Sequence, residues 1–489
     1  MEDRIHIMNT LPRNPEGNYI LYWMQAAQRI EHNYALGLAI ETANKMSKPL
    51  LVVFALTAYP EANIRHYWFM WQGLMEVAAE LAQRSIAFTL IHGHPEKTLE
   101  ILASQACVLI TEKAYLKTPR QWRKNLLPNL ATQYLEVETE VVVPVETTSP
   151  KEEYAAATIR KKITSQWSRY LHPYELPQYE LSRSNRKAEL TQEQESSLKI
   201  LNRETIQSPH ELAALLGLEL EPAVSPVFQG GYSHCISHLE HFLNTKLQDF
   251  AQSRSDPAKQ VQSNMSPYLH FGQISPVDIA LRVKDYWNTE VLGGSAGGFT
   301  QQNQAIPQEP VEAFLEELIV RRELGFNFVY YNPFYDSFAC LPQWARVTLE
   351  EHKSDFRPYT YALEELEQAR THDAYWNAAQ REMIATGKMA GYMRMYWGKK
   401  ILEWTPDPEK AFNLALYLNN KYFLDGRDPN SYAGVAWCFG KHDRPWNKRS
   451  IFGSVRYMND KGLERKFAIK AYAQRWNEPD LFNEPSSLA

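Results

Sequence analysis

The sequence is poor in cysteine and lacks the short motifs that mark several common cofactor sites. Its four cysteines, Cys107, Cys235, Cys340 and Cys438, are scattered over 489 residues and include no CxxC pair. Zinc ribbons and iron–sulfur clusters need closely spaced thiols, so both are excluded, and this cysteine usage favours a reducing compartment. The chain also lacks GxGxxG and GxxxxGK[ST], which excludes the usual dinucleotide fingerprint and the P-loop.

Long apolar runs and a strong charge of one sign are absent as well. No stretch is long enough to span a bilayer, and the N-terminal MEDRIHIMNTLPRNPEG has no apolar segment of the secretory kind. We therefore expect an intracellular protein that does not enter a membrane. The formal net charge of −5 argues against nucleic-acid binding by bulk charge but leaves room for a local basic face.

Aromatic residues, by contrast, are abundant, at 12% of the chain with 13 Trp and 27 Tyr. Such rings can fill a large core or stack on flat ligands. A chain of 489 residues is expected to form two domains or one large two-part fold.

Residues 1–145 alternate between apolar runs and amphipathic segments. The pattern predicts helices over 31–46 and 64–84, and strands over 18–24, 49–56, 86–91, 107–111 and 134–143. Buried strands separated by helices are typical of a parallel, doubly wound sheet, which binds ligands at the carboxyl ends of its strands. We therefore predict an α/β domain of this kind over 1–145.

The remainder of the chain predicts a linker and then an all-α domain. Residues 146–230 are polar, and we expect a long linker with short helices that wraps rather than forming core. Over 231–489 the apolar period is helical almost throughout. A Gly- and Gln-rich stretch, 292–310, interrupts two helices and is expected to be a surface insertion.

Three tryptophans, Trp376, Trp397 and Trp404, lie in the segment HDAYWNAAQREMIATGKMAGYMRMYWGKKILEW. Trp397 and Trp404 are a heptad apart, so on a helix they share one face. Indole is among the easiest side chains to oxidise, so a row of indoles can pass an electron from the protein surface to a buried redox cofactor. Each tryptophan taken alone could equally be an ordinary core residue.

Longer strings resemble the class II DNA photolyases, light-driven enzymes that repair cyclobutane pyrimidine dimers. They are YWMQAAQRIEHNYAL (22–36), SNMSPYLHFGQIS (263–275), FLEELIVRRELGFNFVYYNP (314–333), the tryptophan segment (372–404) and LNNKYFLDGRDPNSYAGVAWCFGKHDRPW (418–446). The resemblance runs over most of the chain. It implies a C-terminal helical domain that holds reduced FAD without a covalent bond and passes an electron to a dimer flipped out of UV-damaged DNA.

The resemblance also implies which residues hold the flavin. Ser263, Asn264, Met265 and Ser266 match the family's phosphate-binding turn, and Pro267 suits the first turn of a helix whose N–H groups attract phosphate. Other matches are a salt bridge between Arg394 and Asp425 against the ring, Met395 packed on it, Asn419 facing flavin N5, and the turn with Gly426 and Asn430.

Trp437 matches a tryptophan that stacks on the lesion, and Glu317 matches an acid that hydrogen-bonds its carbonyls; Glu316 next to it keeps that assignment open by one residue. Burial is expected to keep this carboxyl protonated. Relatives have a second tryptophan where this chain has Arg321 or Arg322, so a guanidinium plane is expected to grip part of the lesion.

A basic stretch, 441–466, predicts the DNA face. Its cations are Lys441, Arg444, Lys448, Arg449, Arg456, Lys461, Arg465 and Lys466. Arg444 resembles the residue that fills the gap left by the flipped bases, and Lys448, Arg449 and Arg456 are expected to contact phosphates.

Other functions on the same fold stay open from the residues alone. A cryptochrome-type blue-light photoreceptor usually carries a C-terminal extension, which the short NEPDLFNEPSSLA does not suggest. A protein that merely stores flavin needs neither the tryptophans nor a DNA face. The resemblance allows a light-harvesting antenna in the N-terminal domain, a deazaflavin, a folate or a flavin. We expect a monomer in the bacterial cytoplasm or another intracellular compartment that contains DNA.

Overall fold

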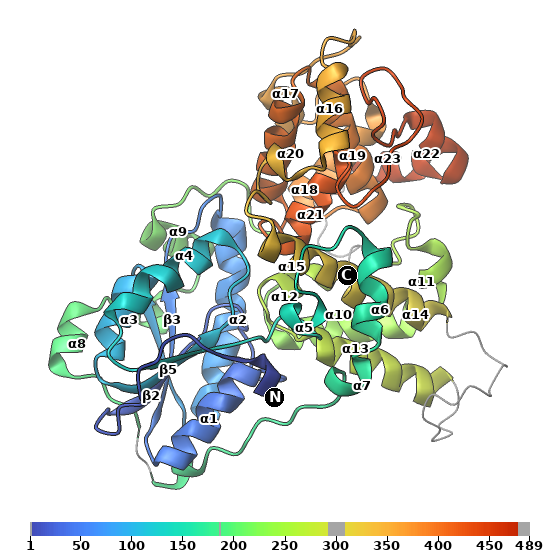
Figure 1. Cartoon of the computed structure of the whole chain (residues 1–489). Coiled ribbons are helices and arrows are strands. Elements are labelled where there is room, and N and C mark those ends of the chain that lie inside the picture. The colour runs from blue at the N-terminus through green and yellow to red at the C-terminus, as the bar shows by residue number, and fades with distance from the viewer. Residues whose placement is uncertain (1, 185–186, 292–308, 478–489) are drawn as a thin grey trace.

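Six strands form one sheet near the N-terminus, in a computed structural model that describes residues 2–184, 187–291 and 309–477 (Figure 1). They are β1 Ile5–Ile7, β2 Tyr19–Trp23, β3 Leu50–Leu56, β4 Ala87–His92, β5 Ala106–Glu112 and β6 Gln133–Val137. The order is β1-β6-β5-β2-β3-β4, and β2 to β6 are parallel, as predicted. The strand order reverses beside β2: β3 and β4 follow it on one side, and β5 and β6 lie on the other. Sheets of this kind bind ligands at such a switch point, here between β2 and β5.

Four helices cover the two faces of this sheet, which explains why its central strands are apolar throughout. Residues of α1 (Tyr34–Met46) and α2 (Ile64–Gln83) share a core with Ile20 and Tyr22 of β2. Residues of α3 (Pro95–Ala103) and α4 (Lys117–Leu126) pack with the opposite side of the same strand. Both α1 and α2 begin at an asparagine whose side chain accepts a backbone N–H bond from the first turn.

The sheet differs from the prediction at both of its ends. The edge strand β1 was missed, and it runs antiparallel to β6, so the sheet is mixed rather than all-parallel. β1 has only three residues, none fully buried, and therefore carries no apolar run. The strand expected over 134–143 ends at Val137, because the backbone N–H of Val142 donates instead to a carboxylate oxygen of Glu323, at 2.5 Å.

Residues 146–230 contain short helices, as expected, but they contribute more core than a wrapping linker would. The helices are α5 Val145–Thr148, α6 Ala156–Thr164, α7 Trp167–Tyr170, α8 Gln192–Ser197 and α9 Pro209–Leu216. Ile159, Ile163 and Leu212 are fully buried in the same core as α1 and α2. Polar composition hid these positions because the buried residues are few and widely spaced.

The rest of the described chain is helical. A first group comprises α10 Tyr232–Thr245, α11 Leu247–Ser253, α12 Ser266–His270, α13 Pro276–Tyr286, α14 Glu309–Leu315, a π-helix Glu316–Arg321 and α15 Arg322–Tyr331. A second comprises α16 Gln343–Glu351, α17 Leu363–Glu367, α18 Ala374–Thr386, α19 Gly391–Trp404, α20 Pro408–Tyr422, α21 Pro429–Cys438, α22 Asp460–Lys466 and α23 Ile469–Asn477. Nearly all of the expected insertion, 292–308, lies outside the described residues.

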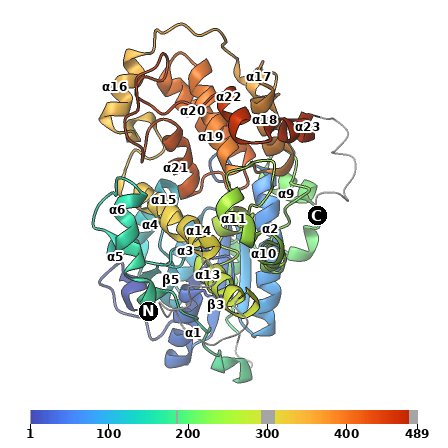
Figure 2. The ribbon, with the colours of Figure 1, turned by 90° about the vertical axis from the view of Figure 1, so that its right-hand side faces the viewer.

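Two buried side chains of α2, Arg65 and His66, connect the α/β domain to the helical region. The two groups of helices in that region lie beside and above the α/β domain in Figures 1 and 2. Arg65 of α2 donates to the carbonyl oxygens of Met383 and Tyr422, at 3.1 and 2.8 Å, and also to that of Ile384. The ring of His66 lies 2.9 Å from the carbonyl oxygen of Phe423. The ends of α18 and α20 are therefore held by a helix of the other domain.

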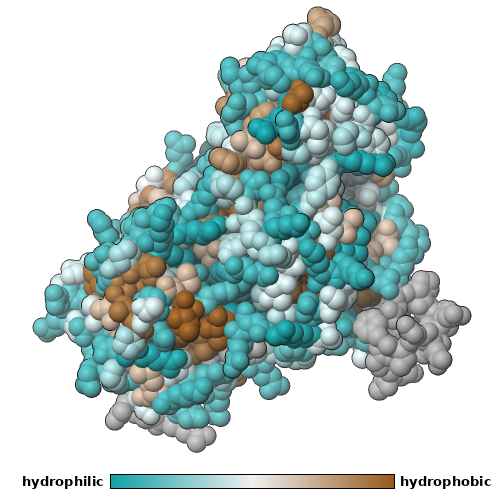
Figure 3. Space-filling model, in the orientation of Figure 1, coloured by the Kyte–Doolittle hydropathy of each residue, from teal (hydrophilic) through white to brown (hydrophobic). Residues whose placement is uncertain are grey.

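The face in Figure 3 is mainly hydrophilic, and its largest apolar area lies over the α/β domain at the lower left. No helix in the described ranges has the length and apolar character that crossing a membrane requires.

Candidate functional site

A pocket of about 510 Å³ opens between the two groups of helices and gathers most of the predicted site residues. Its walls come from the turn before α12, the π-helix, α19 and α21. The predicted residues that line it are Ser263, Asn264, Met265, Ser266, Glu317, Arg321, Arg394, Met395, Asp425, Asn430 and Trp437. Segments up to 174 positions apart in the sequence thus meet at one cavity, the central pocket.

The turn over 263–266 is shaped by its backbone. Asn264 has a φ of +59°, in the left-handed region, and α12 begins at Ser266 with Pro267 in its first turn. The nitrogen Nζ of Lys388 donates to the hydroxyl of Ser266 at 2.6 Å. Lys388 also lines the pocket, so a cation stands directly beside this turn.

Lys388 is a site residue that sequence reasoning missed. It lies just before α19, and the hydrogen bond of its ammonium to Ser266 leaves further ammonium donors for an anion. Burial lowers the pKa of Lys388, and the neighbouring Asp425 opposes that effect. A single lysine in the string GKMAGYMRM offered no signal that could have singled it out.

Arg394 and Asp425 form the predicted salt bridge, with an N–O distance of 3.3 Å. Burial alone would raise the pKa of Asp425, but the charges of Arg394 and Lys388 and a hydrogen bond from Ser266 outweigh it and lower that pKa. The second terminal nitrogen of Arg394 donates to Asn419 at 2.5 Å and to Ser431 at 2.7 Å. Lys388, Arg394 and Asp425 therefore place two cations and one ionised carboxylate together in the lining of the pocket.

Asn419 and Gly426 lie behind the pocket wall rather than in it. Asn419 is fully buried, its oxygen accepts from Arg394, and its amide donates to Asn420 and Ser431 at 2.9 and 3.1 Å. A side chain at Gly426 would come within 2.9 Å of the carbonyl oxygens of Asn420 and Phe423. In this structure Asn419 contacts the pocket through Arg394, and Gly426 is required by close backbone packing.

The three tryptophans form a continuous row behind Arg394. The rings of Trp397 and Trp376 are parallel within 7° with centroids 6.4 Å apart, and Trp404 meets Trp376 edge-on at 5.4 Å. Trp376 of α18 thus sits between the two tryptophans of α19. The guanidinium of Arg394 lies 3.9 Å from the Phe423 ring, which is 6.5 Å from Trp397, so Trp397 is the pocket end of the row.

All three indoles are buried, with exposed fractions of 2% or less, so none of them reaches the surface itself. The outer end, Trp404, has its ring 5.6 Å from the exposed imidazole of His372. The spacing in the sequence could not give this order, because Trp376 comes from a different helix.

Trp437 and Arg321 face each other on the pocket wall, with the guanidinium carbon of Arg321 5.5 Å from the indole centroid. Arg322 is buried and donates to the carbonyl oxygen of Glu140 at 2.6 Å, so Arg321 is the one beside Trp437. Glu317 lines the pocket, whereas Glu316 binds Arg160 at 2.7 Å outside it. Glu317 lies in a π-helix, a distortion that often marks functional sites.

The expected burial of Glu317 is wrong. Its side chain is 43% exposed, and Arg254 forms an ion pair with it at 3.0 Å. The buried positions of this helix are Leu318, Ile319 and Val320, which follow Glu317 directly.

A second groove, of about 750 Å³, holds part of the basic stretch and shares Tyr392 with the central pocket. Its cations are Arg444, Arg449, Arg456, Arg465 and Lys466, and no acid lines it. The guanidinium groups of Arg444 and Arg456 lie 5.6 and 5.2 Å from the Trp446 ring, and that of Arg449 lies 5.1 Å from the Tyr457 ring. We call this surface the basic groove.

Three lysines of the stretch, Lys441, Lys448 and Lys461, are not among the residues that line the groove. Lys441 is buried, forms an ion pair with Glu152 and donates to the carbonyl oxygen of Cys340 at 2.9 Å, so it is a structural cation. Lys448 is exposed and pairs with Glu351 at 3.3 Å, outside the residues that line the groove. A run of charges in the sequence does not distinguish a buried partner from a free surface.

A third cavity, of about 190 Å³, lies at the carboxyl ends of β2, β3 and β5. Aromatic and charged side chains line it, among them Tyr59, His66, Trp122, Glu140 and Arg427. Burial raises the pKa of Glu140 to about 7. We call it the sheet-end cavity.

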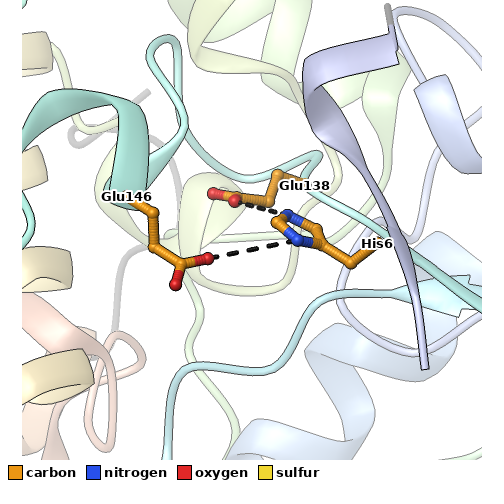
Figure 4. Close-up of side chains that lie close together, drawn as sticks. All are labelled: His6, Glu138 and Glu146. Atoms are coloured by element: carbon orange, nitrogen blue, oxygen red, sulfur yellow. Dashed lines mark hydrogen bonds and ion pairs between the residues drawn. The ribbon is translucent and has the colours of Figure 1, made fainter.

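One group of side chains has metal-ligand geometry, namely His6, Glu138 and Glu146 near β1 (Figure 4). The ammonium of Lys113 already lies between them, 3.1 Å from Glu138, 2.7 Å from Glu146 and 3.4 Å from the His6 ring. Lys113 therefore supplies the positive charge that the two carboxylates require.

This chain is similar over most of its length to known proteins. The family described as DNA photolyase matches residues 20–178. A deoxyribodipyrimidine photo-lyase of Methanothermobacter thermautotrophicus is 47% identical over 97% of this chain and 98% of its own length. One of Arabidopsis thaliana is 37% identical over 93% of this chain and 88% of its own.

Two solved structures share the fold at low identity. A class III photolyase of Agrobacterium tumefaciens superimposes with a TM-score of 0.70 at 16% identity, over 96% of this chain and 88% of its own. The cryptochrome of a Synechocystis species gives 0.70 at 14% identity, over 96% and 89%. These two likenesses concern the fold alone, whereas the long matches at 37 and 47% identity decide the family: the chain belongs to the photolyase/cryptochrome family.

Proposed function

We propose that this chain is a class II deoxyribodipyrimidine photolyase, an enzyme that uses light and FAD to split cyclobutane pyrimidine dimers in DNA. The observation that carries the proposal is the position of the central pocket. The tryptophan row lies behind Arg394 and Phe423, the pair Trp437–Arg321 lines the pocket, and the basic groove shares Tyr392 with it. Flavin storage requires neither neighbour.

The residues of the central pocket suit FAD, which the photolyase/cryptochrome family binds. Lys388 has ammonium donors to spare beside the turn over 263–266, as a pyrophosphate requires. Arg394 is fixed by Asp425 where a flavin ring would carry negative charge. Asn419 and Ser431 hold the other end of that guanidinium, so its orientation is set before a ligand arrives.

When bound and reduced, the flavin supplies the electron that opens the cyclobutane ring. The protein's part is to hold the two pyrimidines out of the helix, which costs a few kcal/mol of lost stacking. Trp437 offers an indole face for a base, and Arg321 narrows the slot beside it. Glu317 is exposed and ion-paired with Arg254, so we assign it the positioning of that guanidinium, which can donate hydrogen bonds to the lesion carbonyls.

Repair of defined oligonucleotides tests the function. Purified enzyme, reduced and illuminated with blue light, should restore a thymine cyclobutane dimer and leave a (6-4) photoproduct unchanged. Repair of a (6-4) lesion needs proton transfer. The strings FLEELIVRREL and NSYAGVAW contain no histidine, and burial lowers the pKa of His442, the histidine in the described lining of the pocket, to about 4. Repair of the (6-4) lesion alone would overturn the proposal, and repair of neither would leave a photoreceptor role as the better account.

Replacing Trp437 by alanine should weaken binding of dimer-containing DNA by about 1–3 kcal/mol, the contribution of one stacked base. Undamaged DNA should lose less affinity, because no base is flipped against the indole. Fluorescence anisotropy with both oligonucleotides measures the difference. Tyr417→Ala, which removes an exposed aromatic ring of α20 outside both grooves, is the control and should change neither affinity.

DNA binding should depend strongly on salt despite the net charge of −5. Arg449→Ala should reduce the slope of log affinity against log salt by about 0.9, the value of one phosphate contact. Lys448→Ala should reduce it less, since Glu351 already neutralises that lysine. Lys97→Ala on α3 is the control. An unchanged slope for Arg449→Ala would move the DNA face away from the basic groove.

We further propose that the sheet-end cavity holds an antenna chromophore. We also propose that the enzyme works as a monomer, in the compartment that contains DNA. The cavity lies at the switch point of the sheet and has aromatic walls. An absorption spectrum of the purified protein shows bands beyond those of FAD if an antenna is present, and analytical ultracentrifugation gives the oligomeric state.

A further inference from the structure

The N–H groups of the three tryptophans have different partners. Trp397 donates its indole N–H to the side-chain oxygen of Gln380 at 2.8 Å, and Trp376 donates to the carbonyl oxygen of Trp397 at 3.1 Å. The N–H of Trp404 is buried without a partner in the described part of the chain. Gln380 lies on α18 and is fully buried.

The partner matters because removal of an electron makes an indole N–H far more acidic. If a base accepts that proton, the oxidised ring becomes a neutral radical, which is a weaker oxidant and no longer draws an electron from its neighbour. Amide oxygens are extremely weak bases, so a carboxamide or a backbone carbonyl accepts the hydrogen bond but leaves the proton on nitrogen.

We propose that Gln380 is a positioning residue that occupies the place beside the Trp397 N–H with a group too weakly basic to take its proton, so that the electron vacancy moves on to Trp404 instead of stopping beside the pocket. The inference rests on the proposed function. Trp397 gives one electron to light-excited, oxidised flavin; Trp376 then gives one to Trp397, and Trp404 gives one to Trp376. At Trp397 and Trp376 no bond to hydrogen breaks.

The contact fixes the orientation of Gln380 as well as its chemistry. Its nitrogen cannot face Trp397, because two N–H donors would meet, so the oxygen must. Within the described ranges no titratable side chain is hydrogen-bonded to an indole of the row. The charged or titratable groups near the pocket end and along α18 are Arg394 over Phe423, and Glu382 with Tyr472 where α23 packs on α18. Those near Trp404 are His372 and Tyr361, with ring centroids 5.6 and 5.0 Å from it, and Asp373, Tyr396, Lys400 and Glu403.

Three variants test this in full-length, FAD-loaded protein. Gln380→Glu keeps the shape and the acceptor but adds a base once it ionises, and burial raises the pKa at which it does so. Gln380→His adds a neutral base over the alkaline range. Gln380→Leu removes the acceptor and adds none. Transient absorption after a flash distinguishes protonated from neutral tryptophan radicals and follows the vacancy as it moves.

In the wild type and Gln380→Leu we expect a protonated radical at Trp397 and a yield of vacancy at Trp404 that does not change with pH. In Gln380→Glu and Gln380→His the yield should fall as pH rises, with a neutral radical left at Trp397. Wild-type yields at every pH in both base-bearing variants, or a neutral Trp397 radical in the wild type, would overturn the inference. Absence of any tryptophan radical in the wild type would instead refute the proposed electron row.

Discussion

Trp397→Phe is expected to abolish light-driven reduction of bound, oxidised FAD while repair by chemically prereduced enzyme stays close to the wild-type rate. Trp397 is the member of the row nearest the central pocket, and its ring lies parallel to that of Trp376. Phenylalanine is far harder to oxidise, so the row loses its first electron donor. Repair does not draw on the row, because the electron given to the dimer returns to the flavin.

The position of each indole predicts a graded outcome. Trp376→Phe should also abolish net photoreduction of FAD, because it interrupts the tryptophan row between Trp397 and Trp404. Trp404→Phe should still allow a short-lived charge separation, with the electron vacancy confined to the two inner rings, Trp397 and Trp376. Trp446→Phe, in the basic groove, is the matched control and should photoreduce normally. Bleaching of the oxidised flavin band under blue light measures all four variants, and normal bleaching in Trp397→Phe would assign the row a structural role only.

Arg394→Met should cost FAD affinity on the scale of about 3–5 kcal/mol, which corresponds to a loss of roughly 150-fold or more. The substitution leaves Asp425 buried without its salt bridge and removes the donor to Asn419 and Ser431. Flavin content after purification and titration of the apoprotein with FAD measure the loss. Circular dichroism shows whether the variant is folded.

The matched variant is Asp425→Asn, which keeps hydrogen-bonding groups but removes the negative charge. It should lose less affinity than Arg394→Met, because an unpaired guanidinium at the pocket edge can still contact water or ligand.

Since the pKa of Asp425 is lowered, its contribution to stability is present above its unfolded pKa and is lost as pH falls through the lower, folded value. Equal affinity in Arg394→Met and the wild type would remove Arg394 from the flavin site.

Strands and helices with a strong apolar pattern could be predicted closely, and weakly patterned ones could not. β3 and β5 are continuous apolar runs and appear within a residue or two of the predicted ranges. β1 was invisible because a short edge strand needs no apolar residues. The segment after Val137 reads as a strand, yet its backbone donors are used by Glu323, a residue of the other domain.

The site shows the same division. The pairing of Arg394 with Asp425 could be anticipated from the resemblance, because motif positions carry over when the fold does. The resemblance left Arg321 and Arg322 open as the guanidinium at the lesion, and the structure places Arg321 beside Trp437. Lys388, the exposure of Glu317 and the burial of Lys441 could not, because each depends on a partner far away in the sequence: Ser266, Arg254 and Glu152. Burial of a polar side chain follows from tertiary contacts that no local pattern records.

The contacts of Arg65 and His66 have a consequence for dissecting the protein into pieces. A fragment that begins at residue 231 would retain α18 and α20 but lose the donors that satisfy the carbonyls of Met383, Tyr422 and Phe423. Each carbonyl left unsatisfied costs about 1–3 kcal/mol where water cannot replace the donor. The carbonyls of Tyr422 and Phe423 lie at the C-terminal end of α20, the helix that carries Asn419. The side-chain oxygen of Asn419 accepts a hydrogen bond from Arg394. The N-terminal domain thus completes the hydrogen bonding of two helices in the catalytic domain, and recombining it with another family member's catalytic half would require matching this set of bonds.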